Sequence, residues 1–114
     1  MAGDLLTKIN YHNGQKSLRY FKLCDDNTLR WAQKEKDLNN PKVYRVCPLG
    51  DIKGIVYGKS NAKFQKHAKG LEAWLCFSLV LENRTIDLYC REDQINYWVI
   101  GLSEELRRIR PKAF

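Results

Sequence analysis

The sequence predicts a mainly β domain with one α-helix, arranged as a seven-stranded antiparallel β-barrel that a C-terminal helix caps. Two observations near the end of the chain carry this prediction. Apolar residues alternate along 74–81 and again along 85–90, on either side of a short turn at Glu82 to Arg84, which is typical of a hairpin of half-buried strands. The spacing then becomes helical, and one face would carry Ile95, Trp98, Val99, Leu102 and Leu106. A small sheet that curls on itself leaves an open corner, which such a helix can cover.

The remaining strands are predicted from shorter alternating segments, separated by turn signals such as Asn13-Gly14. These segments are Asp4–Ile9, Leu18–Cys24, Thr28–Ala32, Val43–Leu49 and Ile52–Tyr57. Residues 33–42 and 59–73 are polar and are predicted to be loops. Because the strands come first and the helix comes last, the order argues against parallel βαβ units.

Composition bounds the class of protein. A chain of 114 residues is the size of one domain, so we expect a single domain over 1–114. It has no apolar run of the roughly 18–20 residues that a membrane span needs, and no recognisable signal peptide. The cysteines form no C-x-x-C pair and lie at no zinc-ligand spacing from a histidine. Reduced, buried thiols in a cytosolic protein are therefore expected, with disulfides or metal binding as the alternative.

The chain is basic, with 20 Lys and Arg residues against 13 Asp and Glu residues and a net charge of +7. This excess favours an anionic partner, which could be a membrane surface, a nucleic acid or a phosphorylated ligand. An ordinary basic soluble domain is the competing interpretation. An enzyme is not expected, because the sequence has no Gly-rich phosphate loop, H-E-x-x-H or G-x-S-x-G. No cofactor and no metal are predicted.

Three features in this order resemble a pleckstrin homology domain over nearly the whole chain. They are residues 3–8 followed by 18–23, which resemble the opening hairpin of that family, residues 76–81 followed by 85–88, which resemble its sixth and seventh strands, and Trp98 in the helix. The resemblance implies an anionic phospholipid ligand at a cytosolic membrane face, without a transmembrane segment. A protein-interaction module is the main alternative, since one fold serves many partners.

Within that family, Phe64-Gln65-Lys66 and residues 74–88 are similar to a subgroup of protist and plant domains. This subgroup includes modules of phospholipase C-like proteins and the acylated pleckstrin homology proteins of apicomplexan parasites. The latter are regarded as readers of phosphatidic acid in microneme secretion. The similarity implies phosphatidic acid as the first choice of ligand, a phosphoinositide as the second, and a secretory organelle as one place of action. We expect a monomer, a protein partner only as the alternative, and no nucleic-acid partner.

The resemblance also implies which residues would hold a head group. In lipid-binding members the ligand lies at the open barrel end, between the loops that join strands 1–2, 3–4 and 6–7. Lys8 can match the family's basic residue at the end of the first strand, and Arg19 matches the arginine of the second. Ser17 stands where another basic residue is expected, and Lys16 is the nearest substitute. Fewer basic side chains suit a single phosphomonoester, because each phosphate needs charge-assisted donors to replace its water shell.

Strand alternation places Arg19 on the same face as Phe21, so its side chain must either emerge at the barrel mouth or form an internal salt bridge. Arg30 and Arg45 could each reach the mouth or point into solvent, and Arg30 is counted with Lys8, Lys16 and Arg19 among the candidate lipid-binding residues. A second basic segment, residues 53–69, contains five lysines and no acidic residue. Lys63 and Lys66 in this segment are candidate membrane contacts. Phe64 lies inside it, and either inserts into the lipid interface or packs back onto the barrel.

Overall fold

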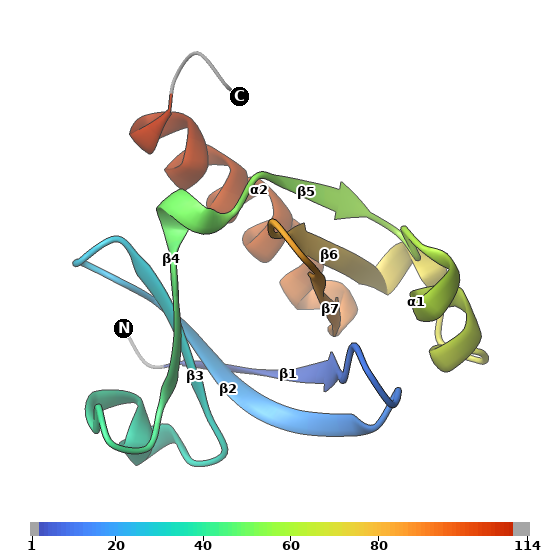
Figure 1. Ribbon diagram of the computed structural model, residues 1–114, viewed down its shortest axis with the longest axis horizontal. Helices are drawn as coiled ribbons and strands as arrows, with labels where there is room; N and C mark the ends of the chain where they lie inside the picture. The colour runs from blue at the N-terminus through green and yellow to red at the C-terminus, as the bar shows by residue number, and fades with distance from the viewer. Residues whose placement is uncertain (1–2, 111–114) are drawn as a thin grey trace.

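Seven antiparallel strands form one curved sheet in the order β4-β3-β2-β1-β7-β6-β5 (Figure 1). The computed structural model describes residues 3–110. The strands are β1 (Asp4–Ile9), β2 (Lys16–Cys24), β3 (Thr28–Ala32), β4 (Arg45–Pro48), β5 (Gly54–Tyr57), β6 (Cys76–Val80) and β7 (Thr85–Tyr89). The helices are α1 (Ala62–His67) and α2 (Glu92–Ile109), with short 3-10 turns at Glu35–Asn39, Leu49–Asp51 and Ala73–Leu75.

The predicted seven antiparallel strands and C-terminal helix are confirmed, but the strands do not form a closed barrel. The sheet is not closed, because β4 and β5 lie at its two ends and no pairing joins them within residues 3–110. Helix α2 lies at this gap and contacts both β5 and the turn at Leu49–Asp51 (Figure 1). The helix therefore substitutes for the missing strand pairing and buries the open corner of the sheet.

The main core fills the concave side of the sheet beneath α2. The helical face contributes Ile95, Trp98, Leu102 and Leu106, all buried, as the spacing predicts. The indole of Trp98 lies edge-on to the ring of Phe21, with 6.5 Å between the ring centroids. The C-terminal helix and the second strand therefore share one apolar core.

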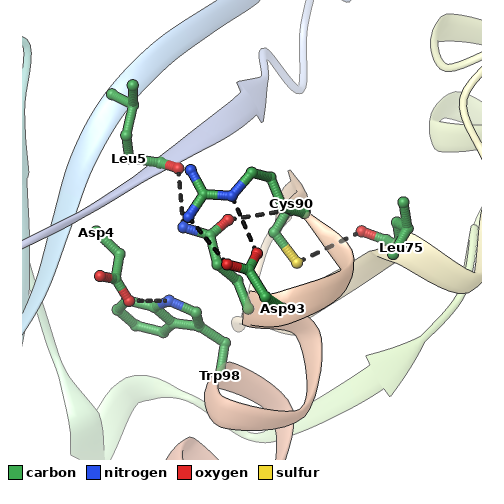
Figure 2. A network of polar contacts seen from close by, with 8 residues as sticks. Asp4, Leu5, Leu75, Cys90, Asp93 and Trp98 are labelled. Carbon is green, nitrogen blue, oxygen red and sulfur yellow. Dashed lines mark hydrogen bonds and ion pairs between the residues drawn. The ribbon is translucent and has the colours of Figure 1, made fainter.

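The first turns of α2 are also held to β1 by polar contacts (Figure 2). Trp98 Nε1 donates to Asp4 Oδ2 at 2.9 Å, and Gln94 Nε2 donates to the carbonyl of Leu5 at 3.4 Å. The Gln94 side chain in turn accepts from the backbone amide of Arg91 at 3.0 Å, which satisfies one of the unpaired donors at the helix start. Helix α2 is thus fixed in direction as well as buried.

A second helix, α1, lies within the segment 59–73, which was predicted to be a polar loop throughout. Phe64 of α1 and Ala68, just after its last residue, pack on the convex side of the sheet against Ile9 and Cys76, forming a second small core. Strand β6 is consequently buried on both faces, rather than on one face as its alternation predicts. The short helix has one buried residue, Phe64, and Ala68 follows just after its end, which is too little for a helical period to stand out in the sequence.

The remaining differences are at the ends of strands. Strand β2 begins at Lys16 rather than Leu18, because Lys16 pairs with Ile9 and lengthens the first hairpin. Strand β4 begins at Arg45 rather than Val43, because the amide of Val43 is used in a turn, where it donates to the carbonyl of Asn40 at 2.9 Å.

The four cysteines are free thiols in the structure. Cys47, Cys76 and Cys90 are buried, and Cys24 is partly exposed. Burial raises the pKa of the Cys76 and Cys90 thiols to about 11. These side chains pack as small apolar groups in the two cores.

Candidate functional site: a basic pocket at the open end of the sheet

A pocket of about 430 Å³ lies at the open end of the concave face, between the β1–β2, β3–β4 and β6–β7 loops. Its walls combine charged, polar and apolar side chains. The lining residues are Lys8, Asn10, Gln15, Ser17, Arg19, Trp31, Ala32, Gln33, Val43, Arg45 and Arg84. Four of them are basic, and no Asp or Glu of the described residues lines the pocket.

Strand alternation explains why Lys8 and Arg19 meet here. Lys8 lies two residues after the buried Leu6 on β1, and Arg19 lies two residues before the buried Phe21 on β2. Alternate residues of a strand point to the same face, so both basic side chains project from the concave face, beyond the end of the apolar core. The sequence-based expectation that these two residues share the barrel mouth agrees with this placement.

Arg45 and Arg84 reach the same pocket by the same rule. Arg45 lies two residues before the buried Cys47 on β4, and Arg84 lies two residues before the buried Ile86 at the start of β7. Sequence reasoning left Arg45 undecided and treated Arg84 only as part of a turn. The signal that finds both is a position two residues before a buried apolar side chain, within β4 for Arg45 and just ahead of β7 for Arg84.

The positive charges in the pocket lie close enough to act on one another. The pKa of Lys8 is lowered, first by burial of its ammonium group and then by the charges of Arg84, Arg19 and Arg45, while Asp87 opposes this shift. A lowered pKa means that the free protein holds the charged form of Lys8 at a cost in free energy. An anion placed between these side chains would remove that cost.

The guanidinium group of Arg19 is not paired with a carboxylate of the described residues. Its Nη1 donates to the backbone carbonyl of Leu18 at 2.8 Å, and within residues 3–110 it forms no ion pair with a carboxylate. Since a guanidinium carries five N–H donors, most of its donors stay directed to the pocket or to solvent. Arg19 can therefore offer charge-assisted hydrogen bonds to an anion.

Two neighbouring positions of β2 lie differently. Ser17 pairs across the hairpin with Lys8 and lines the pocket, so a hydroxyl stands where the family motif has a basic side chain. Lys16 is exposed and is not among the lining residues. The proposed substitution of Lys16 for the missing basic residue has no support in this geometry.

Arg30 lies outside this pocket. Its Nη2 pairs with Asp26 Oδ2 at 2.9 Å, its Nη1 donates to the carbonyl of Leu38 at 3.3 Å, and its guanidinium lies 4.5 Å from the centre of the Tyr44 ring. These contacts hold the β3–β4 connection against β3. The structure thus gives Arg30 a role in holding this connection, away from the side chains that converge at the mouth.

The second basic segment divides into residues with and without partners. Phe64 is fully buried, so the alternative that it inserts into lipid is wrong and the alternative that it packs onto the sheet is right. Lys53 pairs with Glu82 at 2.8 Å. Lys63 Nζ lies 4.1 Å from the centre of the Tyr11 ring, whereas Lys66 is exposed on the same helix. The segment is therefore not one uniform charged surface.

Residues 3–110 contain no cluster of three or more His, Cys, Asp or Glu side chains suited to a metal ion. Neither of the helices in this part of the chain combines the length and the apolar character that crossing a bilayer requires.

The order of strands, the open sheet and the capping helix together define a pleckstrin homology fold. The human ARAP2 protein has an N-terminal pleckstrin homology domain of solved structure that superposes with a TM-score of 0.65. The alignment covers 96% of this chain and 82% of that domain at 17% sequence identity. No protein-family model matches the sequence.

Among curated proteins, the chain is similar to a Xenopus laevis enzyme, 1-phosphatidylinositol 4,5-bisphosphate phosphodiesterase delta-4. The two are 25% identical over 111 residues, which is 95% of this chain and 14% of the enzyme. The chain therefore spans a small part of the length of this relative.

Proposed function

We propose that this domain binds the phosphate groups of an anionic phospholipid head group in the basic pocket. The convergence of Lys8, Arg19, Arg45 and Arg84 on one pocket is the observation that carries the proposal. Such side chains replace the water shell of a phosphate with charge-assisted hydrogen bonds, and arginine can do so in bidentate fashion. The mutual repulsion that lowers the pKa of Lys8 would be offset by the bound anion.

The head group that fits best is an inositol phospholipid with at least two phosphates. Phosphatidic acid was favoured on the sequence because Ser17 removes one basic side chain from the family motif. Arg45 and Arg84 add two basic side chains to the same pocket, which removes the premise of that argument. The similarity to the Xenopus phosphodiesterase, which is named for its action on phosphatidylinositol 4,5-bisphosphate, supports the same choice.

Attachment to the cytosolic face of a membrane follows from this ligand. The net charge of +7 attracts the domain to an anionic surface, and each lysine near that surface adds about 1 kcal/mol. Exposed Lys66 remains a proposed contributor to this attraction. A secretory organelle as the place of action, and a role in microneme secretion, rest on the sequence resemblance alone.

Vesicle sedimentation tests the proposal directly. Vesicles of phosphatidylcholine would contain phosphatidylinositol 4,5-bisphosphate, phosphatidic acid or phosphatidylserine, each adjusted to the same surface charge. We expect the strongest binding to the inositol lipid, and competition by soluble inositol 1,4,5-trisphosphate. Equal binding to all three vesicles would reduce the pocket to a diffuse charge, and preference for phosphatidic acid without competition would restore the first choice made from the sequence.

A further inference from the structure

The β1–β2 loop, residues 10–15, lies between the basic pocket and α1. Asn10 and Gln15, at the two ends of the loop, line the pocket. Tyr11 and Gly14, inside the loop, instead lie against side chains of α1. One wall of the pocket is thus built from a loop whose other side rests on a helix.

Two side chains of α1 make these contacts. Lys63 Nζ lies 4.1 Å from the centre of the Tyr11 ring, within the range of a cation–π interaction. The ring of His67 lies against Gly14, so closely that a Cβ atom at Gly14 would stand 2.2 Å from His67 Nδ1. Gly14 also has a φ of +74°, which a residue with a side chain rarely adopts. Lys63 and His67 are four residues apart, so they share one face of the helix.

The neighbouring face of α1 is fixed to the sheet. Phe64 and Ala68 are buried against Ile9 and Cys76. Asn61 caps the helix through a 2.8 Å contact with the amide of Phe64, and its Nδ2 donates to Thr85 Oγ1 at 3.4 Å. The helix is therefore a fixed support on the convex side of the sheet.

Thr85 connects this support to a buried carboxylate. Asp87, 2% exposed, accepts hydrogen bonds from Ser78 Oγ and Thr85 Oγ1, both at 2.7 Å. The Ser78 hydroxyl also accepts from Ser60 Oγ at 3.0 Å, just before the helix begins. Buried polar networks of this kind fix one arrangement of the elements that they join.

The loop itself is already ordered by local hydrogen bonds. Asn10 Oδ1 accepts from the amides of His12 and Asn13 at 2.9 and 3.2 Å, and the Gly14 amide donates to the carbonyl of Asn10 at 2.9 Å. These bonds set the shape of the loop, and the amide of Asn10, which donates to the carbonyl of Gln15 at 2.9 Å, closes its base. The contacts with Lys63 and His67 join the outer side of the loop to α1.

We propose that Lys63 and His67 are positioning residues, which hold the β1–β2 loop so that Asn10 and Gln15 face the head group. Lys63 then acts through Tyr11 and not by touching the membrane. The inference rests on the proposed function of the pocket. It assigns to α1 a part in head-group affinity that its place outside the pocket does not suggest.

Calorimetric titration with soluble inositol 1,4,5-trisphosphate separates positioning from membrane attraction, because no membrane is present. We expect Lys63→Gln to weaken binding about two- to fivefold, the range of an exposed cation–π contact. Lys66→Gln is the matched control, since it removes the same charge from the same helix, and Lys66 is exposed and forms no ion pair or cation–π contact within residues 3–110. Its binding should equal that of the wild type. Equal losses in both variants, or no loss in either, would overturn the inference.

Tyr11 offers a second test in which the charge is unchanged. Tyr11→Phe keeps the ring beneath Lys63 and should bind the trisphosphate as the wild type does, whereas Tyr11→Leu should show the same loss as Lys63→Gln. Hydrogen exchange should be faster at the amides of 12–15 in Tyr11→Leu, with melting temperature unchanged. Equal affinity of the two Tyr11 variants would count against the positioning role.

The two levels of the proposal fail in different ways. If the wild type bound the trisphosphate and every α1 and Tyr11 variant bound it equally, only the positioning role would fail. If the wild type bound neither the trisphosphate nor any anionic vesicle, the proposed function would fail, and the positioning role with it.

Discussion

Lys8 carries its charge in surroundings that disfavour the charged form. Burial is the main cause of its lowered pKa, and three arginines add to it. For a base with a lowered pKa, the penalty is present below the folded-state pKa and disappears as pH rises toward 10.5, the unfolded value. The side chain therefore lowers the stability of the free domain at neutral pH and is retained, on the proposed function, for the ligand.

Replacing Lys8 with Met should therefore separate stability from binding. We expect Lys8→Met to melt at a higher temperature than the wild type at pH 7 in the absence of ligand, because a partly buried charge has been removed. Added inositol trisphosphate should raise the melting temperature of the wild type but not of the variant. A variant that melts lower than the wild type would show that Lys8 contributes favourable packing that outweighs its charge.

Arg84 and Arg45 were not assigned to the site from sequence, which makes them the sharpest residues to test. Loss of a hydrogen bond to a charged group costs about 1.5–3 kcal/mol, so Arg84→Ala and Arg45→Ala should each weaken trisphosphate binding about 10- to 100-fold. The exposed Arg107 on α2 does not line the pocket, and Arg107→Ala is the control for net charge. Equal losses in all three variants, measured by calorimetry, would mean that total charge and not the pocket governs binding.

At the scale of the element, α1 shows why the sequence was incomplete. The hairpin 74–90 was predicted because apolar alternation along two successive strands is a strong signal. The alternation predicts strands buried on one face, yet Cys76 and Ser78 on the other face of β6 are buried too, Cys76 against Phe64 of the six-residue helix and Ser78 bonded to Ser60 just before it. The signal for α1 was the Asn61 cap three residues before Phe64, which is weak beside the polar composition around it.

Because Phe64 is part of a core, its removal should act on folding. Phe64→Ala should lower the free energy of unfolding by about 3–5 kcal/mol, measured by urea denaturation. Lys66→Ala, on the exposed side of the same helix, should leave it nearly unchanged. A Phe64→Ala variant of unaltered stability and reduced vesicle affinity would reverse the assignment and return Phe64 to the lipid interface.

Helix α2 depends on Trp98 in two ways, by volume and by a hydrogen bond. Trp98→Ala should cost about 3–5 kcal/mol, a large share of the roughly 5–15 kcal/mol that stabilises a domain. Trp98→Phe keeps most of the ring and loses the contact with Asp4, and should cost about 1–2 kcal/mol. Equal melting curves for Trp98→Ala and the wild type would contradict the role of the helix as the cover of the open sheet.

For the whole molecule, apolar patterning and the family resemblance together predicted most of the fold and two of the four basic residues of the pocket. The resemblance alone implied a place for Lys8 at the mouth. Apolar patterning predicted the seven strands, the last helix and the inward direction of Arg19. It could not tell which loops meet at the open end, because that depends on the pairing of β1 with β7, between segments far apart in the sequence. Arg84 lies in one of those loops. Arg30 instead contacts Asp26 and Tyr44, and the sequence alone does not show that these residues lie beside it in the folded domain.

The titration of the whole molecule should be dominated by groups whose pKa is raised on folding. Burial raises the pKa of Cys76 and Cys90 to about 11, and a hydrogen bond to Glu72 raises that of Tyr89 to about 12. The unfolded chain loses these protons at lower pH than the folded domain, so the free energy of unfolding should fall as pH rises above about 9. Burial also raises the pKa of the Cys47 thiol, so the lowered pKa of Lys8 acts in the opposite direction as one group against four.

Urea denaturation at pH 8 and at pH 10.5 would measure this fall. A Cys76→Ala/Cys90→Ala double variant is the control, and its stability should decline less between the two pH values. Increasing stability over this range would mean that Lys8 outweighs the thiols and the phenol.

The strand order has a consequence for synthesis of the chain. Strand β1 sits in the middle of the sheet, with β2 on one side and β7 on the other. Its first edge is covered as soon as the next strand leaves the ribosome, but the second must wait until residues 85–89 have been made. At about 5–20 residues per second this interval lasts roughly 4–15 seconds. During it the nascent chain presents a bare central edge, the feature that recruits other strands, so chaperone protection during translation should matter more for this domain than its small size suggests.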